Sequence, residues 1–153
     1  MMRSIISTAV VMSIPVDGGT AKTLYQACES LGAIAVGVNS IYFVNEPVAG
    51  QIHMLKLPIA GGGPPALATL AYWADSIALD ARTGRVYWTE FGNGRVMGVP
   101  TSGGTPRVIW THARGPDDIV ARSGVLYWTN SMGGTVRKLD LLGALPIETG
   151  GAD

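Results

Sequence analysis

Three polar residues each follow a short aromatic run, and their oxygen-bearing side chains are suited to binding a metal. They are Asn45, Glu90 and Asn130. Hard divalent cations prefer carboxylate and amide oxygens, so three equivalent positions in a ring could share one ion. The alternative is turn chemistry, because an Asn before a Gly- or Ser-containing turn hydrogen-bonds its own backbone. We expect no cofactor, with a divalent cation as the alternative.

A second group of polar residues lies in one predicted loop. It contains His112, Arg114 and Asp117. A histidine can transfer protons near neutral pH, so His112 with Arg114 and Asp117 could form an acid/base group. The alternative is a solvated connector, which polar residues in one exposed loop commonly form. The sequence contains no Ser-His-Asp arrangement, phosphate-binding glycine loop or HExxH pair.

Both groups occupy fixed places in an internal repeat. Tyr42, Tyr87 and Tyr127 are 45 and 40 positions apart, and Ile34, Ile77 and Ile119 are 43 and 42 positions apart. Twenty-one Gly and nine Pro residues, scattered along the chain, mark many tight turns between short apolar runs. A period of about 42 residues with four strands in each unit indicates the blade of a β-propeller, and therefore an all-β fold.

Alternation of apolar and polar residues predicts the strands of each unit. The middle unit has predicted strands at 76–80, 85–89, 95–99 and 107–111. The preceding unit has them at 33–36, 40–44, 53–57 and 66–71, and the following unit at 118–121, 125–129, 136–139 and, weakly, 145–149. Segments 10–14 and 22–25 match only a third and a fourth strand. We therefore expect one domain over 1–153, with an outer half-blade at 1–27 and four-stranded antiparallel blades at 28–72, 73–112 and 113–153.

The blade count has a consequence for assembly. Closed propellers have four to eight blades, whereas this chain has about three to three and a half. Uncovered blade faces would expose apolar surface, which monomers rarely tolerate. We expect self-association that completes a ring of six or seven blades; the alternative is a fragment of a larger propeller. The adjacent aromatic residues of each run should face opposite sides of the blade and form the core between blades.

Composition narrows the possible partners. Of the 153 residues 47% are hydrophobic, and the formal net charge is zero. A neutral chain has no general attraction to nucleic acid, and no apolar run approaches the roughly 20 residues that span a bilayer. We expect neither nucleic-acid binding nor membrane insertion. Residues 11–20 align without a gap with 96–105, so the apolar N-terminus is predicted to be a strand and no convincing signal peptide is present.

The runs Tyr87-Trp88-Thr89-Glu90 and Tyr127-Trp128-Thr129-Asn130 resemble the YWTD class of β-propeller repeats, found in lipoprotein-receptor ectodomains and many bacterial secreted proteins. Segment 88–96 is also similar to repeats of streptogramin lyase and NHL-type propellers. The resemblance implies that ligands meet the rim, meaning the loops between second and third strands and those between blades. It leaves localisation open, because these families are often secreted or periplasmic. The predicted ligand-binding residues on this rim are Asn45, Trp73, Asp75, Glu90, Arg114, Asp117 and Asn130.

The sequence favours a non-enzymatic binding or interaction scaffold whose rim takes a protein, a small molecule or a carbohydrate. One alternative is a metal-dependent enzyme similar to streptogramin lyase or to a lactonase, for which Glu90 and His112 are the candidate residues. The other is a truncated propeller without activity of its own. Shared architecture does not decide between them, because one fold carries many functions.

Overall fold

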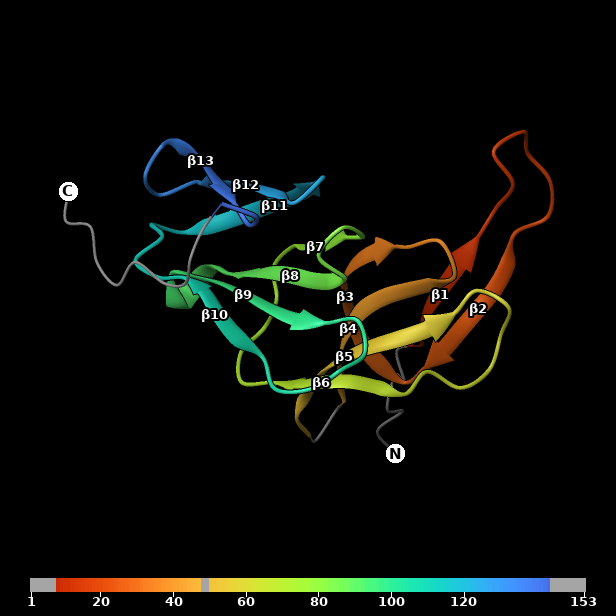
Figure 1. Ribbon diagram of the computed structural model, residues 1–153. Coiled ribbons are helices and arrows are strands. Elements are labelled where there is room, and N and C mark those ends of the chain that lie inside the picture. The colour runs from red at the N-terminus through yellow and green to blue at the C-terminus, as the bar shows by residue number, and fades with distance from the viewer. Residues whose placement is uncertain (1–7, 48–49, 144–153) are drawn as a thin grey trace, which may run out of the picture.

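Antiparallel sheets follow one another along the chain, each with its strands in sequence order (Figure 1). The structure is a computed structural model and describes residues 8–47 and 50–143. The N-terminal strand pair contains β1 (Ala9–Ser13) and β2 (Lys22–Ala27). The first blade contains β3 (Glu29–Val36), β4 (Ser40–Pro47), β5 (Ile52–Pro58) and β6 (Ala66–Leu70). The middle blade contains β7 (Ile77–Asp80), β8 (Arg85–Glu90), β9 (Arg95–Pro100) and β10 (Arg107–Trp110), with a short 3-10 turn, η1 (Phe91–Asn93), between β8 and β9. The third blade contains β11 (Pro116–Arg122), β12 (Val125–Asn130) and β13 (Thr135–Asp140).

The innermost strands establish the architecture. Strand β3 contacts β7, and β7 contacts β11, so neighbouring blades lie against one another through their inner strands as well as their faces. Each blade is an antiparallel meander. The chain is therefore an all-β partial propeller, as predicted.

Two inner strands are longer than predicted. Strand β3 begins at Glu29, where the sequence indicated 33, and β11 begins at Pro116, where it indicated 118. In both cases the pairing with the next strand shifts register near its start. Such an irregularity lets a strand continue outside the regular alternation from which its start was predicted. The weak strand predicted at 145–149 lies outside the described residues.

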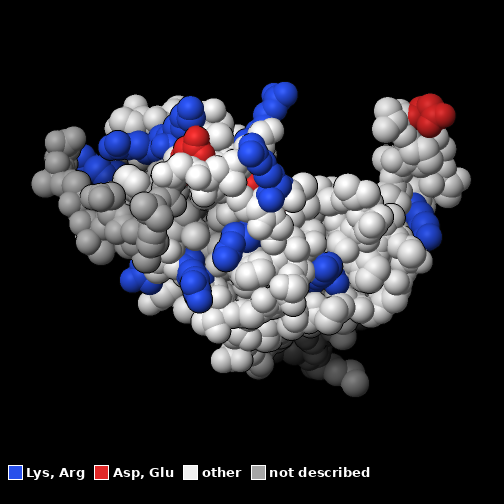
Figure 2. All heavy atoms as spheres, viewed as in Figure 1, with Lys and Arg blue, Asp and Glu red and all other residues white. Residues whose placement is uncertain are grey.

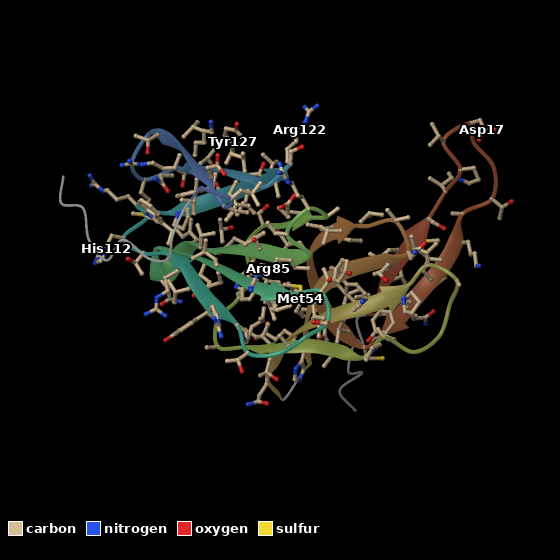
Figure 3. All side chains as sticks on the ribbon, in the orientation of Figure 1. Asp17, Met54, Arg85, His112, Arg122 and Tyr127 are labelled. Atoms are coloured by element: carbon tan, nitrogen blue, oxygen red, sulfur yellow. The ribbon has the colours of Figure 1, made fainter. Side chains whose placement is uncertain are left out.

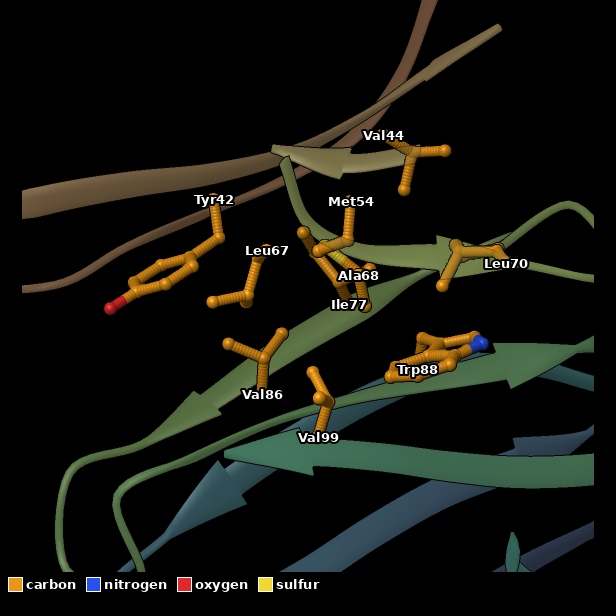
Figure 4. Close-up of a cluster of buried hydrophobic side chains, with 11 residues drawn as sticks. Tyr42, Val44, Met54, Leu67, Ala68, Leu70, Ile77, Val86, Trp88 and Val99 are labelled. Carbon is orange, nitrogen blue, oxygen red and sulfur yellow. The ribbon is translucent and has the colours of Figure 1, made fainter. Parts of the chain in front are cut away.

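The hydrophobic core lies between blades. Trp88 packs in one cluster with Met54 and Leu70 of the first blade (Figure 4). The neighbouring Tyr87 packs in another cluster with Trp128 of the third blade. Successive residues of a strand point to opposite faces, so one run supplies both interfaces of the middle blade. This confirms the prediction that the aromatic runs form the inter-blade core.

The outer face of the third blade has no neighbour among the described residues. Val136 is 71% exposed, but Val96, at the same place in the middle blade, is fully buried (0%). At the opposite end the N-terminal strand pair covers part of the first blade, where Val11 and Phe43 share a cluster. The described residues contain no helix long and apolar enough to cross a membrane.

Candidate functional site

Glu90 and Asn130 end the second strands of their blades, and both side chains contact the tryptophan two residues earlier. Glu90 is 3% exposed, and its Oε1 accepts a 3.3 Å hydrogen bond from Trp88 Nε1. Asn130 Oδ1 accepts the equivalent bond from Trp128 Nε1 at 3.1 Å. Residues two apart on a strand lie on one face, so this spacing was a readable signal in the sequence. The strand-end oxygens are therefore directed into the blade interface.

Glu90 and Asn130 differ in the contacts of their remaining polar atom, which is Oε2 in Glu90 and Nδ2 in Asn130. Asn130 Nδ2 donates to Thr135 Oγ1 at 3.2 Å, whereas Glu90 Oε2 is buried and has no hydrogen-bond partner among the described residues. Burial raises the pKa of Glu90; the Trp88 hydrogen bond and the positive charge of Arg95 oppose this, and the charge of Asp75 adds to it. Glu90 therefore holds its proton to a higher pH than an ordinary glutamate does.

These contacts hold one oxygen of Glu90 and one of Asn130 inside separate blade interfaces. Glu90 and Asn130 each use an oxygen to accept an indole N–H within their own blade. Asn45, in the first blade, is also buried, but Phe43 replaces Trp there and has no N–H to offer. Across the part of the chain that the structure describes, no three His, Cys, Asp or Glu side chains are grouped so that they could hold a metal ion.

The other predicted rim residues are spread over two inter-blade connections. Asp75 Oδ2 accepts a 2.7 Å hydrogen bond from the backbone N–H of Phe91 and so anchors the start of η1. Asp117 has an exposed side chain, and its backbone carbonyl accepts a 2.5 Å hydrogen bond from Thr89 Oγ1 of the middle blade. Trp73 is half-buried and packs on the core between the first and middle blades. These three residues connect elements of the fold.

His112 and Arg114 share an open pocket of about 500 Å³ at the rim of the middle blade. Figure 3 shows His112 at the rim where β10 ends. The pocket is lined by Asn93, Gly94, Arg95, Thr111, His112, Ala113 and Arg114. Sequence reasoning did not single out Arg95, although it directly follows the Asn-Gly turn and pairs with Glu90 across it. The pocket joins the turn between β8 and β9 to the connection that leaves β10.

Backbone contacts hold the two sides of this pocket together. The N–H of Ala113 donates to the carbonyl of Gly94 at 2.9 Å. Gly94 has a φ of +59°, and a Cβ placed there would lie 2.5 Å from the carbonyl oxygen of Ala113. Only glycine permits both the left-handed backbone and this close approach.

The structure thus brings together only part of the predicted set. His112 and Arg114 line the pocket; the other predicted binding residues, Asn45, Trp73, Asp75, Glu90, Asp117 and Asn130, do not. Between His112 and Glu90 there is no hydrogen bond: His112 Nδ1 lies 3.0 Å from Thr111 Oγ1, and Glu90 accepts from Trp88.

Three solved propeller structures are similar in fold to this chain. A nidogen in complex with laminin aligns with a TM-score of 0.75 and 15% identity over 91% of this chain and 54% of that one. A gluconolactonase from Xanthomonas campestris aligns with a TM-score of 0.62 and 13% identity over 79% of this chain and 41% of that one. A streptogramin B lyase aligns with a TM-score of 0.57 and 20% identity over 85% of this chain and 47% of that one.

These similarities establish the architecture. The chain spans about half the length of the solved structures that it matches. No protein-family model matches the sequence, and no curated protein matches it. The chain is similar in fold both to a protein solved in complex with laminin and to two enzymes, so the β-propeller architecture is shared across binding and catalytic proteins.

Proposed function

We propose that this chain is a non-enzymatic binding and interaction scaffold of the YWTD or NHL-like propeller class, built from an outer half-blade (1–27) and blades at 28–72, 73–112 and 113–153. The observation that carries the proposal is the outer face of the third blade, which no other blade covers among the described residues. Tyr127 is 37% exposed there, whereas its counterparts Tyr42 and Tyr87 are 4% and 1% exposed because the next blade covers them. An apolar face of this kind is typical of a protein-protein contact.

We infer that the partner of this face is a second copy of the chain, which supplies further blades toward a ring of six or seven. The third blade carries the same cross-strand Tyr–Lys pair that the first blade presents to its neighbour. Lys56 pairs across the sheet with Tyr42, and its Nζ donates to the carbonyl of Thr101 in the middle blade at 3.0 Å. Lys138 pairs with Tyr127 in the same way. A neighbouring blade would therefore meet both an apolar surface and an ammonium donor.

We favour a scaffold over a lyase-like or lactonase-like enzyme because the two candidate catalytic residues, Glu90 and His112, make separate contacts. The carboxyl group of Glu90 is buried against Trp88. His112 is exposed and lies with Thr111 in the rim pocket. A general acid or base must reach both its partner and a substrate, and the contacts of these two side chains separate them.

Light scattering on a sizing column tests the proposal, because each chain adds 16.0 kDa. We expect the native protein to have the mass of two copies and Val136→Asp to have the mass of one. Val108→Asp is the matched control, since Val108 is exposed on β10 of the middle blade, away from this face; it should retain the double mass. A native chain that has the mass of one copy at every concentration would overturn the proposal.

A further inference from the structure

The rim pocket is rich in hydrogen-bond donors and has no acidic lining residue. Arg95, Arg114, His112 and Asn93 contribute donor-capable side chains, and no Asp or Glu lines it. The side chains of Arg95, His112 and Arg114 are exposed. On the face shown in Figure 2, Lys and Arg side chains are distributed over the middle and third blades with few Asp or Glu between them. The charge of the pocket is therefore positive.

The acidic residues on the neighbouring strand ends and connections, Glu90, Asp75 and Asp117, do not line the pocket. Glu90 is the strand partner of Arg95, but its side chain is buried and its Oε1 accepts the hydrogen bond of Trp88. The Oδ2 atom of Asp75 accepts the backbone N–H of Phe91, which directs this carboxylate to the start of η1. A guanidinium without a paired carboxylate is free to bind an oxyanion from solution through two parallel N–H donors.

The donors are carried by backbone that is held in place. The Ala113–Gly94 hydrogen bond ties the segment bearing Arg95 to the segment bearing His112 and Arg114. On the other side Arg114 rests against the third blade, where its Cβ lies 3.2 Å from the position that a Cβ on Gly133 would take. Because this backbone is already fixed, binding a ligand does not have to order the two connections that carry the arginines.

His112 has an unusual backbone conformation that bears on its role. Its φ of +58° is left-handed, which few residues other than glycine adopt. Residues held in such conformations cluster at binding sites. Thr111 Oγ1 lies 3.0 Å from His112 Nδ1, and a hydroxyl that donates to Nδ1 leaves Nε2–H as a donor. Such a donor would complement the two guanidinium groups.

We propose that this pocket binds an oxyanion, the carboxylate or phosphate group of a small organic ligand, between Arg95 and Arg114 with His112 as a further donor. The pocket, at about 500 Å³, is in the size range of small-molecule sites and larger than a lone phosphate requires. The inference rests on the proposed scaffold function, because it assigns a ligand class to the rim.

The test is an NMR titration of the labelled full chain with inorganic phosphate and, separately, with succinate at constant ionic strength. We expect saturable shifts confined to the backbone amides of 93–95 and 111–114 and the side-chain N–H groups of both arginines. Arg95→Gln and Arg114→Gln should each raise the dissociation constant at least about tenfold, since they remove a charge-assisted pair of hydrogen bonds.

Arg107→Gln is the matched control, because Arg107 is an exposed arginine on β10 that does not line the pocket. It should leave the dissociation constant unchanged. Tighter binding of phosphate or of succinate would each support the proposal and would identify the anion. Shifts that never saturate, or equal weakening by all three substitutions, would overturn it. Light scattering on the same samples reports self-association independently, so loss of the anion site and failure of the scaffold proposal are distinguishable.

Discussion

The middle and third blades carry almost the same aromatic run, yet the structure uses the two runs differently. In the middle blade both faces are covered, and Tyr87 and Val96 are buried. In the third blade the inner face is covered, whereas Tyr127 and Val136 on the outer face are exposed. Residues at the same place in the two blades should therefore contribute more to the free energy of unfolding where a neighbouring blade covers them. Substituting both members of such a pair measures how much the neighbouring blade adds.

The largest difference is expected for the tyrosines. Tyr87→Ala removes a buried ring whose hydroxyl lies 3.1 Å from Thr83 Oγ1, and it should lower the free energy of unfolding by about 3–5 kcal/mol. Tyr127→Ala should cost about 1 kcal/mol, because that ring keeps much of its contact with water. Urea unfolding at a concentration where the chain is a monomer measures both. Equal losses under those conditions would contradict the comparison.

The valines should show the same contrast on a smaller scale. Val96→Ala opens a cavity in a fully buried position and should cost about 2 kcal/mol. Val136→Ala should change the free energy of unfolding by less than about 0.5 kcal/mol, as is usual at exposed positions. Raising the protein concentration until a second copy binds should increase the cost at Val136 and leave that at Val96 unchanged.

A third pair tests the hydrogen bonds between blades. Thr89 Oγ1 accepts from the N–H of Ser76 at 3.2 Å and also donates to the carbonyl of Asp117 in the next blade. Thr129 Oγ1 accepts from the N–H of Asp118 at 3.1 Å and has no next blade to reach among the described residues. Thr89→Val should therefore cost about 1 kcal/mol more than Thr129→Val in thermal or urea unfolding.

The steric control for this pair is present in the chain. The first blade has Val44 at the position of Thr89, and that valine is fully buried. The valine side chain therefore fits, and a loss at Thr89 reports the hydrogen bonds. If the two substitutions have the same cost, the bond to Asp117 adds nothing to the blade interface.

The smallest effect concerns the strand-end residues, Glu90 and Asn130. Burial raises the pKa of Glu90, so the folded state binds this proton more tightly than the unfolded state. Stability from this group is therefore greatest below the ordinary glutamate pKa and falls as the pH rises toward the raised value. Glu90→Gln should remove this loss, so the variant gains in melting temperature relative to the native protein between acid and neutral pH.

Glu46→Gln controls for the change of charge, because Glu46 is an exposed glutamate near the end of β4. Its melting temperature should follow that of the native protein across the same pH range. A Glu90→Gln profile parallel to the native one would show that the carboxyl group is not desolvated in solution.

Local pattern accounts for most of the fold. Turn residues and alternation placed every described strand, because a short meander is determined by local turn chemistry and by burial of alternate residues. The Trp88–Glu90 hydrogen bond also follows a local spacing of two residues and could have been inferred from the sequence. The starts of β3 and β11 could not, because register irregularities depend on the partner strand.

The rim pocket lay beyond sequence reasoning for a different reason. It depends on a backbone hydrogen bond between Gly94 and Ala113 and on the left-handed conformation of His112. No local sequence pattern predicts either feature. The hydrogen bond joins two turns that are far apart in the sequence, and a left-handed backbone is uncommon for any residue with a Cβ. His112 and Arg114 were therefore predicted as part of one loop, without Arg95 beside them.

The pairing of each strand with its sequence neighbour has a kinetic consequence. Almost all close contacts join segments within one blade or in adjacent blades, as the succession of β3, β7 and β11 shows. Stability in such arrays is approximately a sum of repeat terms and nearest-neighbour terms. Opening should therefore begin at the two ends of the described array, the N-terminal strand pair and the third blade, and reach the middle blade last. Strand β8 is paired on both edges and buried on both faces, so its amides should be the slowest to exchange with solvent.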